Sequence, residues 1–338
     1  MSVSIKDIAK ISGVSTATVS RALSDPTRVS EKTRQAIMEV VEKHGYRVNS
    51  HARSLRRQRA DAILALLPDL GNPFFSVILS GIELELQDHG MDLLVADSRA
   101  TERTGRSVFN HLHASRVDGV ICLDGTPTDA ARAELAEPDV AERVVFACEW
   151  MADGDFPYVR SDNRGGGALA VDHLVGLGHC DIAFLRGPVD NILTEEREAG
   201  VREALAKHGL DLPDTRVGGH DFTLEAGFEA AEWIAGLSPR PTAVICTSDQ
   251  IAIGLMSGLR ERGLSVPDDV SVVGFDDIAS AAYVTPSLTT IRQDRIGLGR
   301  AAAQVMLKRI GVGKAPEACV CTLPVSLMTR HSTAAPKA

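Results

Sequence analysis

The stretch Val14-Ser15-Thr16-Ala17-Thr18-Val19-Ser20-Arg21-Ala22-Leu23 has the pattern of a short helix that begins directly after a turn. Val19, Ala22 and Leu23 recur at i, i+3 and i+4, so they share one buried stripe. The other face carries small or hydrogen-bonding groups and one guanidinium, from Thr16, Ala17, Ser20 and Arg21. Such a face suits the major groove of DNA. A capped helix in any small helical bundle would have a similar pattern, so the neighbouring sequence has to separate the two interpretations.

Two further helices are expected around this stretch. Ser4 and Ser30 are placed to cap helices over residues 5–12 and 31–44, as Ser15 is for the helix between them. Gly13 ends the first helix and permits a tight turn into the second. Two short helices joined in this way form a helix-turn-helix unit, so the sequence predicts an all-α DNA-binding domain over residues 1–47.

The charge of the chain is divided unevenly. Residues 1–59 hold 12 Lys or Arg and 5 Asp or Glu, a net charge of +7, whereas the remainder carries −16, so the total is −9. A basic N-terminal part on an acidic body indicates a polyanionic partner that only the basic part binds. Double-stranded DNA fits this description.

Residues 48–59 connect the two parts and contain four arginines within the seven residues 53–59. One interpretation is a solvated linker, because like charges at this density repel one another. The other is a hinge helix that forms on DNA and inserts Leu55 into the minor groove as an apolar wedge.

From residue 60 onward, short apolar runs alternate with amphipathic ones. Strands are expected at 62–67, 92–96, 119–123, 143–147, 181–185, 243–246, 271–273 and 288–291, with a further one around Cys319 and Cys321, and helices at 73–89, 164–177, 195–208, 224–237 and 250–262. This alternation predicts an α/β core of parallel sheets covered on both faces. The run is too long for one open sheet, so two subdomains with a cleft between them are expected.

Ligands of such folds bind beyond the carboxyl ends of the strands. Aromatic and hydrogen-bonding residues follow the expected strands repeatedly, and the candidate effector ligands among them are Asn72, Phe74, Phe75, Asp124, Trp150, Arg197, Phe222, Asp276 and Gln293. Asp69, Glu149, Asp221 and Ser248 also follow strands. Rings that stack on a flat molecule and carboxylates that bind hydroxyls suit a small polar ligand. For any single residue, a helix cap or a place in the core is an equally ordinary role.

Motifs of other protein classes are missing from the sequence. It has no G-x-x-x-x-G-K-[ST] phosphate loop and no G-x-S-x-G nucleophile elbow, and its six cysteines show no zinc-binding spacing. Gly165-Gly166-Gly167 falls inside an expected helix. No apolar run is long enough to cross a bilayer. We therefore expect a cytoplasmic protein that is not an enzyme and uses no metal or cofactor.

The N-terminal motifs closely resemble those of the LacI/GalR repressor family. They are Ile5-Lys6-Asp7-Ile8-Ala9, Gly13-Val14-Ser15, Thr18-Val19-Ser20-Arg21, Val29-Ser30, Thr33-Arg34, Gly45-Tyr46 and Ala52-Arg53-x-Leu55. In the body, Asn72-Pro73-Phe74-Phe75, Ser248-Asp249 and Gly274-Phe275-Asp276 match as well, so the resemblance spans roughly residues 3–333. Within the family, the likeness is greatest to cytidine-responsive and purine-responsive repressors. One departure is Val48, where the family usually has proline before the hinge asparagine.

The resemblance implies base-reading positions at Thr16, Ala17 and Arg21 and a wedge at Leu55. The full set of candidate DNA contacts is Ser15, Thr16, Ala17, Ser20, Arg21, Asn49, Ala52 and Leu55. It also implies effector contacts at Phe75, Trp150, Arg197, Phe222 and Asp276 and a core over residues 60–338. Its expected N-subdomain covers about 60–160 and 292–323, and its C-subdomain about 161–291 and 324–338.

The sequence therefore predicts a transcriptional regulator, a repressor by its resemblance, whose affinity for operator DNA depends on a small effector. A nucleoside is preferred over a sugar as effector, and both remain open, as does whether the effector releases the DNA or promotes its binding. The residues after Arg330 contain no heptads, so no tetramerising coiled coil is expected there, and the resemblance then implies a homodimer. The alternative from another class is a sugar or nucleoside sensor or enzyme that carries an unrelated N-terminal helical module.

Overall fold

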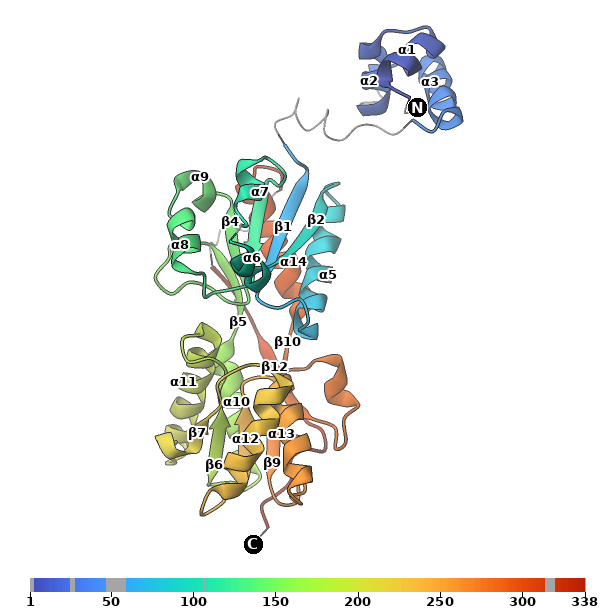
Figure 1. Ribbon diagram of the computed structural model, residues 1–338. Helices are drawn as coiled ribbons and strands as arrows, with labels where there is room; N and C mark the ends of the chain where they lie inside the picture. The colour runs from blue at the N-terminus through green and yellow to red at the C-terminus, as the bar shows by residue number, and fades with distance from the viewer. Residues whose placement is uncertain (1–2, 25–27, 47–58, 106, 314–319, 338) are drawn as a thin grey trace. The chain divides into compact units, whose positions relative to one another are not determined.

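The computed structural model describes residues 3–24, 28–46, 59–105, 107–313 and 320–337 (Figure 1). The chain divides into two compact units, Met1–Ala60 and Asp61–Ala338.

The first unit contains the three predicted helices, α1 (Ile5–Ser12), α2 (Thr16–Ser24) and α3 (Glu31–Lys43). The Ser4 and Asp7 side chains form a reciprocal capping box at the start of α1, and Gly13 ends it at φ 66°. The helices pack through a small apolar core in which Ile8, Val19 and Ile37 are fully buried. The three-helix prediction is confirmed, whereas the predicted hinge helix, apart from Arg59, lies outside the described residues.

In the part of the second unit that the structure describes, the strands form two six-stranded sheets. The first has the order β11-β5-β4-β3-β1-β2, with bounds Val320–Leu323, Tyr158–Ser161, Val144–Ala147, Gly119–Cys122, Ala62–Leu67 and Asp92–Asp97. The second has the order β12-β10-β9-β8-β6-β7, with bounds Val325–Met328, Thr289–Gln293, Ser271–Asp276, Ala243–Cys246, Ile182–Leu185 and Val217–Gly218. Neighbouring strands are parallel except β10 and β12, which are antiparallel. The α/β class with two parallel-dominated sheets is thus confirmed.

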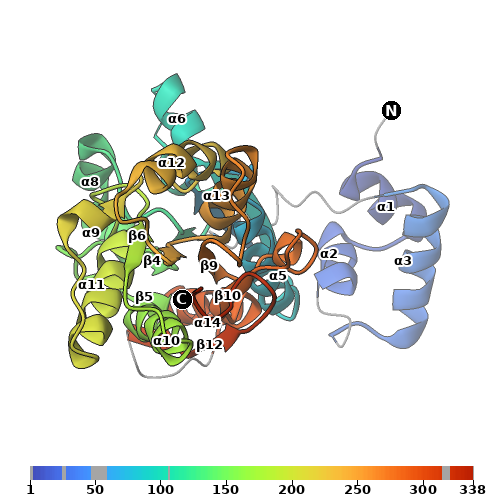
Figure 2. The ribbon, with the colours of Figure 1, turned by 90° about the horizontal axis from the view of Figure 1, so that it is seen from below.

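Helices cover both sheets. On the first, α5 (Pro73–Gln87) packs against α14 (Arg295–Arg309), and the shorter helices are α6 (Ser98–Thr104), α7 (Asn110–His113), α8 (Asp129–Leu135) and α9 (Pro138–Ala141). On the second, α10 (Asn163–Gly176) packs with α11 (Ile192–Lys207), and α12 (Leu224–Gly236) packs with α13 (Asp249–Glu261). These two pairs bury separate apolar clusters against opposite faces of the second sheet (Figure 2).

The chain passes between the two sheets three times, after β5, after β10 and after β11. The first two passages lead into α10 and α14, and the third leads through Pro324 into β12. Each sheet is therefore built from separate segments of the sequence. We call the part around the first sheet the N-subdomain and the part around the second the C-subdomain.

The eight enumerated strands were predicted to within three residues, but β5, β7 and β12 were not predicted. Strand β5, Tyr-Val-Arg-Ser, is half-buried and alternates apolar with polar residues over only four positions. Strand β7 has two residues. Segments this short carry too little periodicity to be distinguished from loops.

Gly167, the last of the three consecutive glycines of α10, permits a close helix contact. A Cβ atom on Gly167 would lie 2.6 Å from the carbonyl oxygen of Arg197 and 2.9 Å from the amide nitrogen of Val201, both on α11. Gly200 of α11 meets the backbone of Arg164 in the same way. Gly167 and Gly200 thus allow α11 to lie close against α10, and the three consecutive glycines belong to a helix, as expected, and not to a phosphate loop.

Replacing Gly167 by alanine is expected to destabilise the protein by about 1–3 kcal/mol, because the new methyl group has to displace backbone atoms. Gly176→Ala is the matched control on the same helix, where a Cβ atom would meet nothing within 4 Å. That variant should be neutral or slightly stabilising. Urea unfolding measures both, and equal stabilities would contradict the close contact between α10 and α11.

Candidate functional site

A cavity of about 330 Å³ lies between the two subdomains, where the carboxyl ends of both sheets meet. The N-subdomain lines it with Pro68, Asp69, Asn72, Phe75, Arg99, Asp124, Thr126 and Glu149, and the C-subdomain with Pro188, Val189, Asp190, Asn191, Asp221, Phe222, Thr223 and Gln250. A smaller cavity of about 40 Å³ shares four of these residues and adds Phe74, Cys148, Leu193, Arg197, Ser248 and Asp276. We call the two cavities together the cleft. Its size and its mixture of rings and polar groups suit a small-molecule site.

Arg197 is the buried cation of the cleft, with 3% of its surface exposed. Its Nε atom donates a hydrogen bond to Asn163 Oδ1 at 2.9 Å, and Nη1 donates to the backbone carbonyl of Thr247. Nη1 also lies 3.7 Å from Asp276 Oδ1. The guanidinium stacks over the Phe275 ring, 3.8 Å from its centre. A guanidinium held by so many contacts is preorganised, so a ligand need not order it on binding.

Two carboxyl groups lie beside this arginine. Burial raises the pKa of Asp276 to about 6, although Arg197 counteracts the effect. Burial and the neighbouring Asp276 raise the pKa of Asp249, which accepts hydrogen bonds from the Thr290 hydroxyl at 2.5 Å and the Ile278 amide at 2.8 Å. Asp249 is therefore committed to holding the loop after β9, and Asp276 is the carboxyl group that lines the cleft.

The backbone of the cleft is strained at two non-glycine residues. Cys148, directly after β4, has φ 69°, and Asp276, the last residue of β9, has φ 120°. Both residues line the smaller cavity. Such conformations cost about 1–3 kcal/mol each and cluster at binding and catalytic sites. They agree with a functional role for this edge of the sheets.

Helix α2 of the first unit presents the face that the sequence assigned to DNA. Ser15, Thr16, Ala17 and Arg21 are exposed, while Ser20 is half-buried. Ser15 accepts a hydrogen bond from the Thr18 amide at 3.1 Å, so the predicted cap is confirmed. The other candidate DNA contacts, Asn49, Ala52 and Leu55, lie outside the described residues.

Comparison with known proteins decides the family. Residues 4–49 match the model of bacterial regulatory proteins of the lacI family, and residues 171–333 match that of the periplasmic binding protein-like domain. The HTH-type transcriptional repressor CytR of Escherichia coli (strain K12) is 34% identical over 330 residues, which cover 96% of each chain. The chain belongs to the LacI family.

Solved structures of the LacI family agree with this fold over nearly the whole chain. The lac repressor dimer bound to operator and the anti-inducer ONPF matches with a TM-score of 0.84 and 28% identity, covering 99% of this chain and 100% of that one. The complex of the regulator CelR with cellobiose matches with a TM-score of 0.73 and 30% identity, covering 98% and 99%. The chain is thus a DNA-binding transcriptional regulator with an effector-binding core, and not an enzyme.

The structure brings most of the predicted effector ligands of this LacI-family regulator together. Asn72, Phe74, Phe75, Asp124, Arg197, Phe222 and Asp276 all line the cleft. Trp150 and Gln293 do not line either cavity. The Trp150 ring stacks on Tyr158, with ring centres 5.3 Å apart, and Gln293 Nε2 donates to Asp276 Oδ1 at 2.7 Å. Gln293 is therefore placed to support a cleft residue, and the role of every member of the set stays a prediction.

Several lining residues were absent from the sequence-based set, among them Arg99, Thr126 and Gln250. Arg99 follows β2 by two positions, so the rule that found the other ligands would have found it at the end of that strand. Thr126 lies two residues after the predicted Asp124, and Gln250 lies two residues after the strand-end residue Ser248. The sequence does not show which residue of such a loop turns toward the cleft.

Within the described residues, no group of three or more His, Cys, Asp or Glu side chains could hold a metal ion. None of the described helices is both long and apolar enough to span a membrane.

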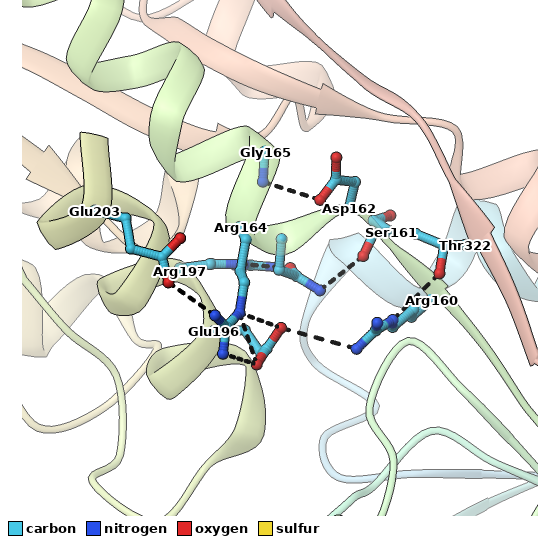
Figure 3. A network of polar contacts seen from close by, with 10 residues as sticks. Arg160, Ser161, Asp162, Arg164, Gly165, Glu196, Arg197, Glu203 and Thr322 are labelled. Atoms are coloured by element: carbon cyan, nitrogen blue, oxygen red, sulfur yellow. Dashed lines mark hydrogen bonds and ion pairs between the residues drawn. The ribbon is translucent and has the colours of Figure 1, made fainter. Parts of the chain in front are cut away.

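An ionic network bridges the two subdomains beside the cleft (Figure 3). Arg160 of β5 lies 3.8 Å from Glu196 of α11, measured from Nη1 to Oε2, and its Nε donates to Thr322 Oγ1 of β11 at 3.3 Å. Arg164 of α10 binds Glu196 and Glu203, both on α11. Of the ion pairs drawn in this network, Arg160–Glu196 is the one that joins the N-subdomain to the C-subdomain. This ion pair therefore depends on how the two subdomains lie relative to each other.

A double-mutant cycle of Arg160→Met and Glu196→Gln should show a coupling free energy of about 0.2–1 kcal/mol, the usual range of partly exposed ion pairs. Urea unfolding of the two single variants and the double variant measures it. The same cycle with Arg160→Met and Glu203→Gln is the control, because Glu203 contacts only Arg164 in the network. Equal coupling free energies in the two cycles would contradict a direct contact between Arg160 and Glu196.

Proposed function

We propose that this regulator binds a near-palindromic operator as a homodimer and that a nucleoside in the cleft sets its operator affinity. The observation that carries the proposal is that Phe75 from the N-subdomain and Phe222 from the C-subdomain line both cavities and share the smaller one with Arg197 and Asp276. Two rings suit the faces of a base, and the charged pair suits the hydroxyls or edge of the same molecule. A ligand that contacts both subdomains stabilises whichever angle between them allows all contacts.

On DNA, Thr16, Ala17 and Arg21 read base edges in the major groove, with Ser15 and Ser20 beside them. Asn49, Ala52 and Leu55 act at the minor groove, where Leu55 is the wedge. The exposure of Ser15, before α2, and of Thr16, Ala17 and Arg21 on α2 supports the first half of this assignment. The match of Ala52-Arg53-x-Leu55 to a motif of the family supports the second half.

The homodimer has a candidate surface on the N-subdomain. Leu94 and Val95 of the edge strand β2 are 40% and 41% exposed, and Leu84 of α5 is 44% exposed. Exposed apolar side chains on an edge strand are a liability unless another chain covers them. A second copy of this chain would place two DNA-binding units on one operator, as in the lac repressor dimer.

A sugar is the second candidate effector. The CelR relative was solved with cellobiose, and the carboxylates of the cleft can accept hydrogen bonds from sugar hydroxyls as readily as from ribose. The two phenylalanine rings favour the nucleoside, because they offer two stacking surfaces.

Thermal unfolding of the purified protein with cytidine, adenosine, ribose and cellobiose tests the effector. A ligand at 100 times its dissociation constant stabilises the folded state by about 2.7 kcal/mol, which shifts the melting temperature by several degrees. A shift with a nucleoside but not with ribose supports the proposal, whereas a shift with a sugar alone replaces the nucleoside. Fluorescence anisotropy with DNA from upstream of the protein's own gene, with and without that ligand, shows whether the effector weakens or strengthens binding. Equal affinity for this DNA and for random DNA would contradict the proposed regulator function.

A further inference from the structure

The charged groups that line the larger cavity of the cleft are mainly anionic. Five carboxylates line it, from Asp69, Asp124, Glu149, Asp190 and Asp221, against the single cation of Arg99. Arg197 lines the smaller cavity, but Asp276 is its ion-pair partner and Asn163 and Thr247 accept its hydrogen bonds. The site therefore offers a ligand more negative than positive charge.

Two of these carboxylates are buried, with 7% of Asp124 and 5% of Glu149 exposed. Asp124 accepts hydrogen bonds from the Ser98 hydroxyl at 2.5 Å and from the Thr126 amide at 2.9 Å. Glu149 Oε2 accepts one from the Gly125 amide at 2.9 Å. All of these donors are neutral, and neither carboxylate has an ion-pair partner among the residues that the structure describes.

Asp124 and Glu149 lie on neighbouring strand ends, after β3 and β4, and the charge of Asp124 disfavours charge on Glu149. Burial and the charge of Asp124 raise the pKa of Glu149 to about 7. A third anion beside them would be repelled in a water-poor setting, where screening is weak. A hydroxyl or amino group would instead donate a hydrogen bond to them.

We infer that Asp124 and Glu149 make the cleft selective against anions, so its effector is uncharged or cationic and the phosphorylated form of the same compound is excluded. This inference rests on the proposed function and narrows its ligand class. Asp124 and Glu149 are specificity-determining residues in this account, because discrimination comes from a repulsive element as well as from attractive contacts.

Isothermal titration calorimetry of the full-length protein tests the inference with matched pairs: cytidine and cytidine 5′-monophosphate, adenosine and adenosine 5′-monophosphate, ribose and ribose 5-phosphate. The unphosphorylated member of at least one pair should bind, and its phosphorylated partner should bind at least 100-fold more weakly. Tighter or equal binding of the phosphorylated member overturns the inference. The absence of binding by all three unphosphorylated compounds would also overturn the inference. DNA binding measured in parallel shows whether the proposed regulator function fails as well.

Neutral variants of the same shape separate charge from shape. The dissociation constant of a phosphorylated compound divided by that of its unphosphorylated partner should fall at least 10-fold in Asp124→Asn and in Glu149→Gln. Asp190→Asn, a control on the exposed rim of the same cavity, should change this ratio of dissociation constants less than 3-fold. An unchanged ratio in both buried variants would assign the exclusion to shape and overturn the role of Asp124 and Glu149. Should a variant fail to fold, the wild-type ratios still decide the anion selectivity.

Discussion

Replacing Arg197 by methionine is expected to destabilise the folded chain by about 3–5 kcal/mol, because it leaves a buried carboxyl group without its cation. Arg197 is almost fully buried and forms the ion pair with Asp276 that the cleft contains. Methionine retains an apolar stem over Phe275, so the loss reflects the charge more than the packing. The same change should abolish effector binding. Urea unfolding and calorimetry measure the two effects separately.

The stability loss should depend on pH in a known direction. Burial already raises the pKa of Asp276 to about 6 beside Arg197, and without the arginine this pKa rises further. Between the unfolded and folded pKa values, the folded variant binds a proton that the unfolded chain has released, so its stability falls as pH rises. The deficit relative to wild type should therefore be smaller at pH 5 than at pH 8.

The double variant Arg197→Met/Asp276→Asn is the control. Asparagine removes the stranded charge and keeps an oxygen that can accept the hydrogen bond from Gln293. Most of the lost stability should return, because a buried pair replaced as a whole is often neutral for stability. Effector binding should not return. A single variant that loses less than 1 kcal/mol, with no difference between pH 5 and pH 8, would show that the pair is not desolvated as described.

Much of the cleft was predictable because parallel strands end at one edge, so residues distant in sequence converge there. This rule places Phe75, Asp124 and Asp276 together, and the structure agrees. The rule cannot say which way a side chain turns after the strand. Trp150 follows β4 directly after Glu149, yet its ring stacks on Tyr158 of β5, a strand too short to predict.

Contacts between the subdomains could not be predicted from the sequence for a related reason. Arg160 and Glu196 are each ordinary charged residues in amphipathic segments, and their pairing depends on the angle between the two sheets. The anionic surroundings of the larger cavity depend on the same angle, because its carboxylates come from both subdomains. Local patterns determine the strands and helices, whereas the character of the cleft arises only once the two subdomains face each other.

Arg21→Ala is expected to weaken binding to the operator by about 1–3 kcal/mol for each lost base contact, and a dimer with two DNA-binding units loses two such contacts. Arg21 is exposed on α2, in the last turn of the helix, and Val19 and Ala22 anchor that helix in the apolar core. Binding to random DNA should fall far less, because there the same arginine contributes only its charge. Fluorescence anisotropy with a duplex selected by the wild-type protein from a random library, and with a scrambled duplex, measures both.

Lys43→Ala is the matched control, because it removes one exposed positive charge from α3 and leaves the face of α2 intact. It should weaken binding to both duplexes by a similar, small factor, since a phosphate-type contact is insensitive to sequence. The salt dependence of binding should become slightly shallower in both variants, as each neutralises fewer phosphates. Equal losses on the selected and scrambled duplexes with Arg21→Ala would make this arginine a phosphate contact and leave base reading to Thr16 and Ala17.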